Sequence, residues 1–167
     1  MNLDMDDEEE DKYRRELAQQ IEIAFADVPY PGDDKIIANP NRWYSSHLPA
    51  LLAGKHWQEI PLNIIIQENL ILPLFTPEGF RFYFPAFLRA AVLYHDQVDV
   101  LTSFVFYSLN PPEEDETRMS DFLNRINGFT HPQIEVIKAF VRMYIVIEHS
   151  YPDAARDRAG VFWEQKK

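Results

Sequence analysis

A histidine and two aspartates stand close together in the segment His95-Asp96-Gln-Val-Asp99. Imidazole nitrogen and carboxylate oxygen bind divalent metals, so these residues are candidate ligands for a metal-dependent hydrolase. On a helix, His95 and Asp99 would share one face, with Asp96 displaced from it by about 100°. The alternative is that Asp96 is a helix N-cap and His95 a half-exposed loop residue. No spacing ties another histidine to His95, so we predict no metal and no other cofactor.

A second group of candidate binding residues lies in the segment 76–88, which contains five aromatic residues and two prolines. Glu78 and Arg81 have the i, i+3 spacing of a helical ion pair, and they also suit a recognition pair at the mouth of a pocket. The Tyr83 hydroxyl needs a partner if it is buried, so Tyr83 anchors a core network or lines a site. Pro85 cannot donate its backbone hydrogen bond, so it should kink or split the helix. A kinked, aromatic-rich helix usually forms the centre of a core, and a kink is also a place where a small-ligand pocket can form.

Three aromatic residues, Trp43, Tyr44 and Trp57, follow a loop that prolines and glycine indicate over residues 29–42. Aromatic side chains on exposed loops are common anchors of protein–protein interfaces. They also cap helical cores, where their rings are buried. We therefore predict these residues as contacts with a protein partner, with core packing as the alternative.

Several kinds of catalytic site are excluded by composition. The chain contains no cysteine, which rules out disulfides, thiolate nucleophiles and zinc–thiolate centres. It has five glycines, and neither a Gly-x-Gly-x-x-Gly nor a Walker phosphate-binding loop is present. Ser45, Ser46 and His47 place hydroxyls beside an imidazole, but sequence neighbours do not make a triad, and no Gly-x-Ser-x-Gly elbow occurs.

Negative charge is concentrated at the N-terminus. The net charge is −11, and residues 1–11 hold seven of the 27 acidic residues and no basic one. We predict that residues 1–11 form a disordered acidic tail and that residues 12–167 form a single helical domain. The rest of the chain is mildly acidic, which argues against nucleic acid or an anionic membrane as the partner.

The chain carries no pattern for membrane insertion or export. No apolar run approaches the roughly 20 residues that span a bilayer. The acidic N-terminus lacks the positive charge of signal and transit peptides, so we expect a cytoplasmic location. Oligomeric state is not predicted from the sequence.

The elements that position these residues are predicted to be helices. Apolar stripes, caps and breakers indicate helices over the ranges 13–28, 43–53, 77–94, 98–109, 119–126, 130–147 and from about 152 onward. Residues 61–72 contain an Ile-Ile-Ile run with strand propensity, but their spacing also fits a helix, and we favour a short buried helix. The predicted fold is all-α, a compact irregular bundle of six or seven helices around one core, with a kinked central helix at Pro85.

The central segment resembles the signature of a bacterial family of small uncharacterised proteins, roughly Leu-Thr-Pro-Glu-Ala/Gly-Phe-Arg-Tyr-Tyr-Leu-Pro-Ala-Tyr/Phe. The matching residues are Thr76, Pro77, Glu78, Gly79, Phe80, Arg81, Tyr83, Pro85, Ala86 and Phe87. The resemblance continues upstream to Trp57 and downstream to residues 129–133 and 162–163. It departs at Phe75, where the family pattern has leucine. The resemblance implies a compact, mostly helical domain and brings no established activity and no catalytic residues.

These observations favour a non-enzymatic binding protein, with an immunity- or antitoxin-like role against a basic protein partner. Acidic residues of the segments 1–11 and 113–116 would steer the encounter, and the aromatic residues near the loop would supply the buried anchor. The alternatives are a metal-dependent hydrolase at the histidine–aspartate cluster and a small-ligand binder at the Pro85 kink.

Overall fold

The computed structural model describes residues 6–98, 100–113, 115–147 and 154–167. All regular secondary structure in these ranges is helical, as predicted, although there are eight α-helices in them rather than six or seven. The α-helices are α1 (Asp7–Ala24), α2 (Leu48–Leu52), α3 (Leu62–Gln67), α4 (Pro77–Leu93), α5 (Leu101–Ser108), α6 (Glu116–Ile126), α7 (His131–Ile147) and α8 (Ala154–Gln165). Three short 3-10 helices connect them, namely η1 (Asp33–Lys35), η2 (Trp57–Glu59) and η3 (Leu72–Leu74).

Helix α4 carries the segment 76–88 through the centre of the molecule. Twelve of its 17 residues are buried, and it packs against α1, α3, α5 and α6. The Thr76 hydroxyl accepts a hydrogen bond from the Gly79 N–H at 2.9 Å, which caps the helix start as expected. Pro85 does not split the helix, which runs on to Leu93. Its missing N–H deprives the Arg81 carbonyl of the usual helical donor.

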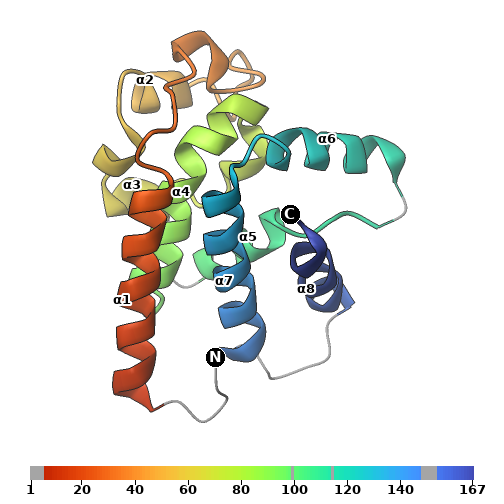
Figure 1. The fold of residues 1–167 in the computed structure, drawn as a ribbon. Helices are drawn as coiled ribbons and strands as arrows, with labels where there is room; N and C mark the ends of the chain where they lie inside the picture. Colours follow the sequence, from red (N-terminus) through yellow and green to blue (C-terminus); the bar gives the residue numbers. More distant parts are fainter. Residues whose placement is uncertain (1–5, 99, 114, 148–153) are drawn as a thin grey trace.

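The other long helices surround α4. Helix α1 packs against α4 and lies beside α7, which packs against α8, whereas α6 projects away from the body (Figure 1). Aromatic rings join these elements in the core. The ring of Phe129, just before α7, lies 5.8 Å from Phe25, 6.3 Å from Phe80 and 6.1 Å from Phe84. Phe80 and Phe84 of α4 are therefore part of the core.

The first helix begins earlier than predicted. Residues 7–11, which we expected in a disordered tail, form the start of α1, and residues 1–5 lie outside the described residues. The Asp6 carboxylate accepts a hydrogen bond from the Glu9 N–H at 2.9 Å. Four acidic residues fill the first turn, where the positive end of the helix dipole favours them. The acidic run therefore initiates a helix.

Helix α2 begins later than predicted, at Leu48 rather than at Trp43. Pro49 has no N–H to donate and is tolerated only in the first turn of a helix, so the helix cannot start far before it. Residues 43–47 form turns instead.

Two further predictions concern short helices. Helix α3 confirms the short helix expected within residues 61–72, and Ile65 is its buried residue. Helix α5 begins at Leu101 rather than near Val98, and its N-cap, Val100, makes no side-chain cap hydrogen bond. Asp96 is therefore not the N-cap that we expected for this helix.

Candidate functional site

Trp43 and Tyr44 form an exposed aromatic pair on the turns before α2. Trp43 is 88% exposed, the highest value among the large hydrophobic side chains of the described ranges, and Tyr44 is 43% exposed. Their ring centroids are 5.6 Å apart and their planes are nearly perpendicular, at 85°. This edge-to-face contact restricts both rings while it leaves apolar area open to solvent.

Hydrogen bonds hold the turns that carry this pair against neighbouring segments of the protein. Ser45 is only 1% exposed, and its hydroxyl donates a hydrogen bond to the Asn39 carbonyl at 2.6 Å. The Nε2 atom of His47 lies 3.1 Å from a carboxylate oxygen of Glu68, just after α3. The Ser45 hydroxyl is thus engaged with backbone, and the neighbouring imidazole is directed to Glu68.

Trp57 does not belong to this exposed surface, although the sequence grouped it with Trp43 and Tyr44. Its side chain is completely buried, and its indole N–H donates a hydrogen bond to the Phe25 carbonyl at 3.2 Å. The Arg89 guanidinium lies 5.3 Å from the centre of the ring. The core-packing alternative holds for Trp57, which ties η2 to α1 and α4.

Glu78 and Arg81 line one cavity but do not pair with each other. Arg81 Nη1 donates hydrogen bonds to the carbonyl oxygens of Asn124 at 3.0 Å and Arg125 at 3.3 Å, at the C-terminal end of α6. Both Glu78 and Arg81 lie in the wall of a cavity of about 610 Å³, between the turn that follows α1 and the start of α7. Arg81 therefore fastens α6 to α4 at the edge of this cavity.

Tyr83 is part of a buried network. Its hydroxyl donates to the carbonyl oxygens of Leu52 at 2.7 Å and Lys55 at 3.0 Å, and burial raises the pKa of Tyr83. Tyr30 extends the network, because its hydroxyl accepts a hydrogen bond from the Gly54 N–H at 2.8 Å. Pro85 is buried in the core. The cavity of about 610 Å³ lies at the N-terminal end of α4, where Glu78 and Arg81 line it, and not at Pro85 as predicted.

The histidine–aspartate cluster lies at the end of α4, and Asp99 falls outside the described residues. His95 Nε2 lies 3.0 Å from a carboxylate oxygen of Asp96. The His95 Nδ1 atom is buried and has no hydrogen-bond partner among the described residues. Within those residues, no group of three or more acidic or histidine side chains is arranged to hold a metal ion. The structure thus brings together two of the three predicted ligands.

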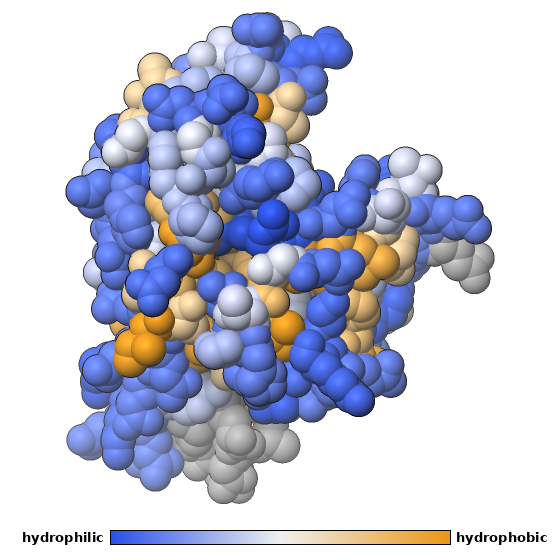
Figure 2. Space-filling model, turned by 45° about the horizontal axis from the view of Figure 1, so that its top comes forward, coloured by the Kyte–Doolittle hydropathy of each residue, from blue (hydrophilic) through white to orange (hydrophobic). Residues whose placement is uncertain are grey.

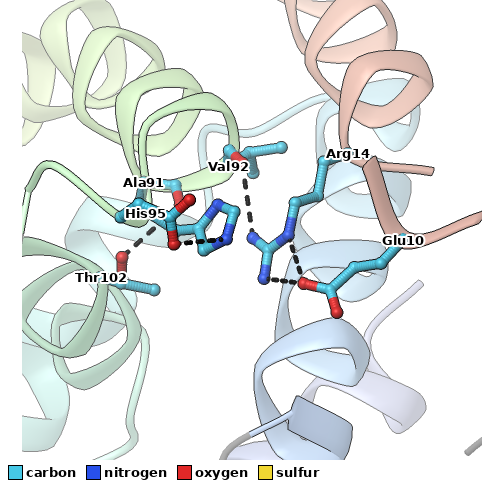
Figure 3. Close-up of polar contacts among 7 residues, drawn as sticks. Glu10, Arg14, Ala91, Val92, His95 and Thr102 are labelled. Atoms are coloured by element: carbon cyan, nitrogen blue, oxygen red, sulfur yellow. Dashed lines mark hydrogen bonds and ion pairs between the residues drawn. The ribbon is translucent and has the colours of Figure 1, made fainter. Parts of the chain in front are cut away.

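Arg14 approaches this cluster from α1 and was missed by sequence reasoning (Figure 3). It is 5% exposed. Its guanidinium contacts the Glu10 carboxylate at 2.6 and 2.7 Å, and its Nη1 donates to the Val92 carbonyl at 3.4 Å. The sequence signal for this ion pair is the i, i+4 spacing of Glu10 and Arg14. Arg14 and His95 line a small cavity of about 110 Å³.

The acidic segments lie apart from the aromatic pair. Helix α1 starts at the opposite end of the molecule from α2, and Asp115 and Glu116 stand at the start of the projecting helix α6 (Figure 1). Glu113 forms an ion pair with Arg158 at 2.8 Å, and Asp115 caps α6 through the Arg118 N–H at 3.0 Å. The acidic side chains that the structure describes in these segments are therefore not part of the surface that Trp43 presents.

The surface is predominantly hydrophilic on the face shown in Figure 2, where hydrophobic atoms gather in small patches, including one where the α6 arm meets the body. Among the described residues, no helix has the length and apolar character needed to cross a membrane.

The chain belongs to a family of unknown function (DUF6714), whose sequence profile matches residues 13–167. No curated protein and no solved structure matches the chain.

Proposed function

We propose that this member of a family of unknown function is a non-enzymatic binding protein that docks onto a positively charged protein through Trp43 and Tyr44. The single observation that carries the proposal is that Trp43 is 88% exposed on a turn held by hydrogen bonds. An aromatic pair of this kind offers a large apolar contact area with two polar atoms, the indole N–H and the phenol O–H, at its edges.

The anchoring of the turn favours binding. A partner that covers Trp43 does not have to order a mobile segment, because the buried Ser45 hydroxyl and the His47–Glu68 contact hold the turn in place. Pre-organised contact residues lose less conformational entropy on association. Buried Trp and Tyr side chains are the most frequent energetic centres of protein interfaces, each worth about 2 kcal/mol or more.

Net charge indicates the sign of the partner. The chain carries a net charge of −11, which repels acidic proteins and accelerates encounter with basic ones. The acidic segments are separated from Trp43, so their field steers the partner and the aromatic pair contributes the contact. Neutralisation of a basic toxin, in the manner of immunity and antitoxin proteins, is the activity class that combines these two features.

The proposal is tested by capture of partners from a lysate of the native organism. Wild-type protein, the double variant with Trp43→Ala and Tyr44→Ala, and the control Tyr94→Ala serve as baits. Tyr94 is a matched control because it is also an exposed aromatic residue, at 38%. We expect a basic protein to be retained by the wild type and the control and lost with the double variant.

A second set of variants distinguishes electrostatic steering of the partner, which sets the association rate, from direct contact, which sets the dissociation rate. Neutralising Glu113, Asp115 and Glu116 with amides is expected to slow association and weaken its salt dependence, with the dissociation rate unchanged. Capture that does not depend on Trp43 and Tyr44, or a captured partner of acidic charge, would contradict the proposed function.

A further inference from the structure

A third cavity lies between α5, α6 and the turn that leads into η3. Its volume is about 490 Å³, which is within the range of about 300–1,000 Å³ that is usual for small-molecule sites. Its walls are largely apolar and include Leu72, Phe104 and Phe122. Phe122 and Leu72 belong to the core of the protein. A ligand in this cavity would therefore lie against a fixed apolar wall.

One side of the cavity is lined by Arg125, near the end of α6. Its guanidinium lies 5.9 Å from the centre of the Phe80 ring, and partial burial lowers the pKa of Arg125. In the described part of the chain, the Arg125 guanidinium has no carboxylate oxygen within 4.0 Å and donates no hydrogen bond. A half-buried guanidinium has up to five N–H donors, and an anion with two oxygens fits their planar arrangement.

The charges around the cavity indicate an anion of single charge. Arg118, Asp121 and Arg125 are its charged lining residues. Arg118 already lies 3.4 Å from the carboxylate of Asp115. The lining therefore has a net charge of +1, because Asp121 offsets one of the two arginines. A carboxylate matches this charge better than a doubly charged phosphate does.

Asn110 is a second unsatisfied polar group at the same cavity. Its Oδ1 atom is buried and has no hydrogen-bond donor among the described residues, and Asn110 is one of the lining residues. Buried polar atoms without partners are rare in native proteins, and sites completed by a ligand or water are one reason for them. Two polar groups without a hydrogen-bond partner among the described residues thus occur beside one apolar cavity.

We propose that this cavity binds a small amphipathic monocarboxylic acid. The carboxylate forms a bidentate ion pair with Arg125, and the apolar body of the ligand lies against Leu72, Phe104 and Phe122. This site is separate from the Trp43–Tyr44 surface, and its occupation does not require a protein partner.

Octanoate is the probe for the proposal, with 1-octanol and octylamine as ligands that share its chain but not its charge. Titration is followed by calorimetry and by amide shifts of ¹⁵N-labelled protein. We expect saturable octanoate binding with a Kd of about 0.1–1 mM. The shifts should map to residues 69–73, 104–112 and 118–125, and both control ligands should bind about tenfold more weakly.

Three variants locate the ligand. Arg125→Gln is expected to weaken octanoate binding about tenfold. Arg15→Gln removes an exposed arginine of α1 and should leave binding unchanged. Ser108→Phe fills the cavity without altering its charge and should abolish octanoate binding. Thermal unfolding of each variant shows whether it is folded.

The proposal is overturned by any of four results. These are the absence of saturable octanoate binding up to about 5 mM, equal affinity for octanoate and 1-octanol, shifts that map outside the cavity, or unchanged affinity in folded Arg125→Gln protein.

Discussion

The Tyr83 hydroxyl donates a hydrogen bond of 2.7 Å to the carbonyl oxygen of Leu52, the last residue of α2. This contact connects the central helix to the short helix that follows the Trp43–Tyr44 turns. A second hydrogen bond, to the Lys55 carbonyl at 3.0 Å, fixes the turn at Gly54. The support beneath the exposed aromatic pair therefore reaches into the core through Tyr83.

Tyr83→Phe removes both hydrogen bonds and keeps the ring. We expect the free energy of unfolding to fall by about 0.5–1.5 kcal/mol, because the hydroxyl contacts are lost while the Leu52 carbonyl keeps the Lys55 N–H as a donor. Urea denaturation measures the difference. Tyr94→Phe is the matched control and should change stability by less than about 0.5 kcal/mol. An equal, small effect in both variants would contradict the anchoring role of Tyr83.

Gly79→Ala is expected to destabilise the start of α4. A Cβ atom at Gly79 would lie 2.2 Å from the Ile36 carbonyl oxygen, a backbone atom that cannot rotate away. The loop that contains Ile36 must then move, at a cost of about 1–3 kcal/mol. At Gly54 an added Cβ atom meets no other atom within 4 Å. Gly54→Ala would be strained by its backbone instead, because φ is +69°, a value that residues with a side chain rarely adopt. Normal stability of Gly79→Ala would show that this loop does not pack as described.

Arg81→Ala is expected to weaken the attachment of α6. The variant loses both hydrogen bonds from Arg81 to the end of α6, at an expected cost of about 1–2 kcal/mol. Glu78 is exposed at the N-terminal end of α4, where Glu78→Gln should cost less than about 1 kcal/mol. Thermal unfolding compares the two variants. A larger loss for Glu78→Gln would favour the original ion-pair interpretation.

The sequence predicted best those helices whose local residue pattern is sufficient to define their burial and their ends. Helix α4 is apolar on nearly every face, which requires burial, and Thr76 and Pro77 mark its start. Pro49 marks the start of α2 in the same way, because a proline is tolerated only in the first turn of a helix. The negative charge of residues 7–11 is typical of a solvated tail, but Asp6 followed by acidic residues is also a helix-start pattern.

The candidate site was less predictable because its contacts join distant residues. Arg81 was expected to pair with Glu78 in the same helix, but its acceptors are 43 and 44 residues away. Trp57 and Trp43 have the same side chain, yet one is buried and the other is exposed. Tertiary packing decides such cases, and no local pattern encodes it.

The ion pair between α7 and α8 gives a pH dependence. Arg142 donates to the Glu164 carboxylate at 2.5 and 2.9 Å, and this hydrogen bonding lowers the pKa of Glu164. A lowered pKa in the folded state stabilises the protein above the unfolded-state pKa of about 4.3, and this contribution is lost as the pH falls through the folded-state value.

Glu164→Gln should therefore be less stable than the wild type at neutral pH and equally stable at acidic pH. Because both side chains are about half exposed, the difference at neutral pH should be below about 1 kcal/mol. Urea denaturation at pH 7 and pH 3 measures it, with Arg142→Gln expected to show the same convergence. A difference that persists at the lower pH would have a cause other than this ion pair.

Dissociation kinetics of the captured partner test the central claim, that Trp43 is the anchor of a protein interface. Surface plasmon resonance compares wild type, Trp43→Ala and Tyr94→Ala. We expect Trp43→Ala to dissociate about 30-fold faster or more, with little change in association rate, because a buried tryptophan acts after the encounter. Tyr94→Ala should match the wild type. An unchanged dissociation rate for Trp43→Ala would contradict the claim.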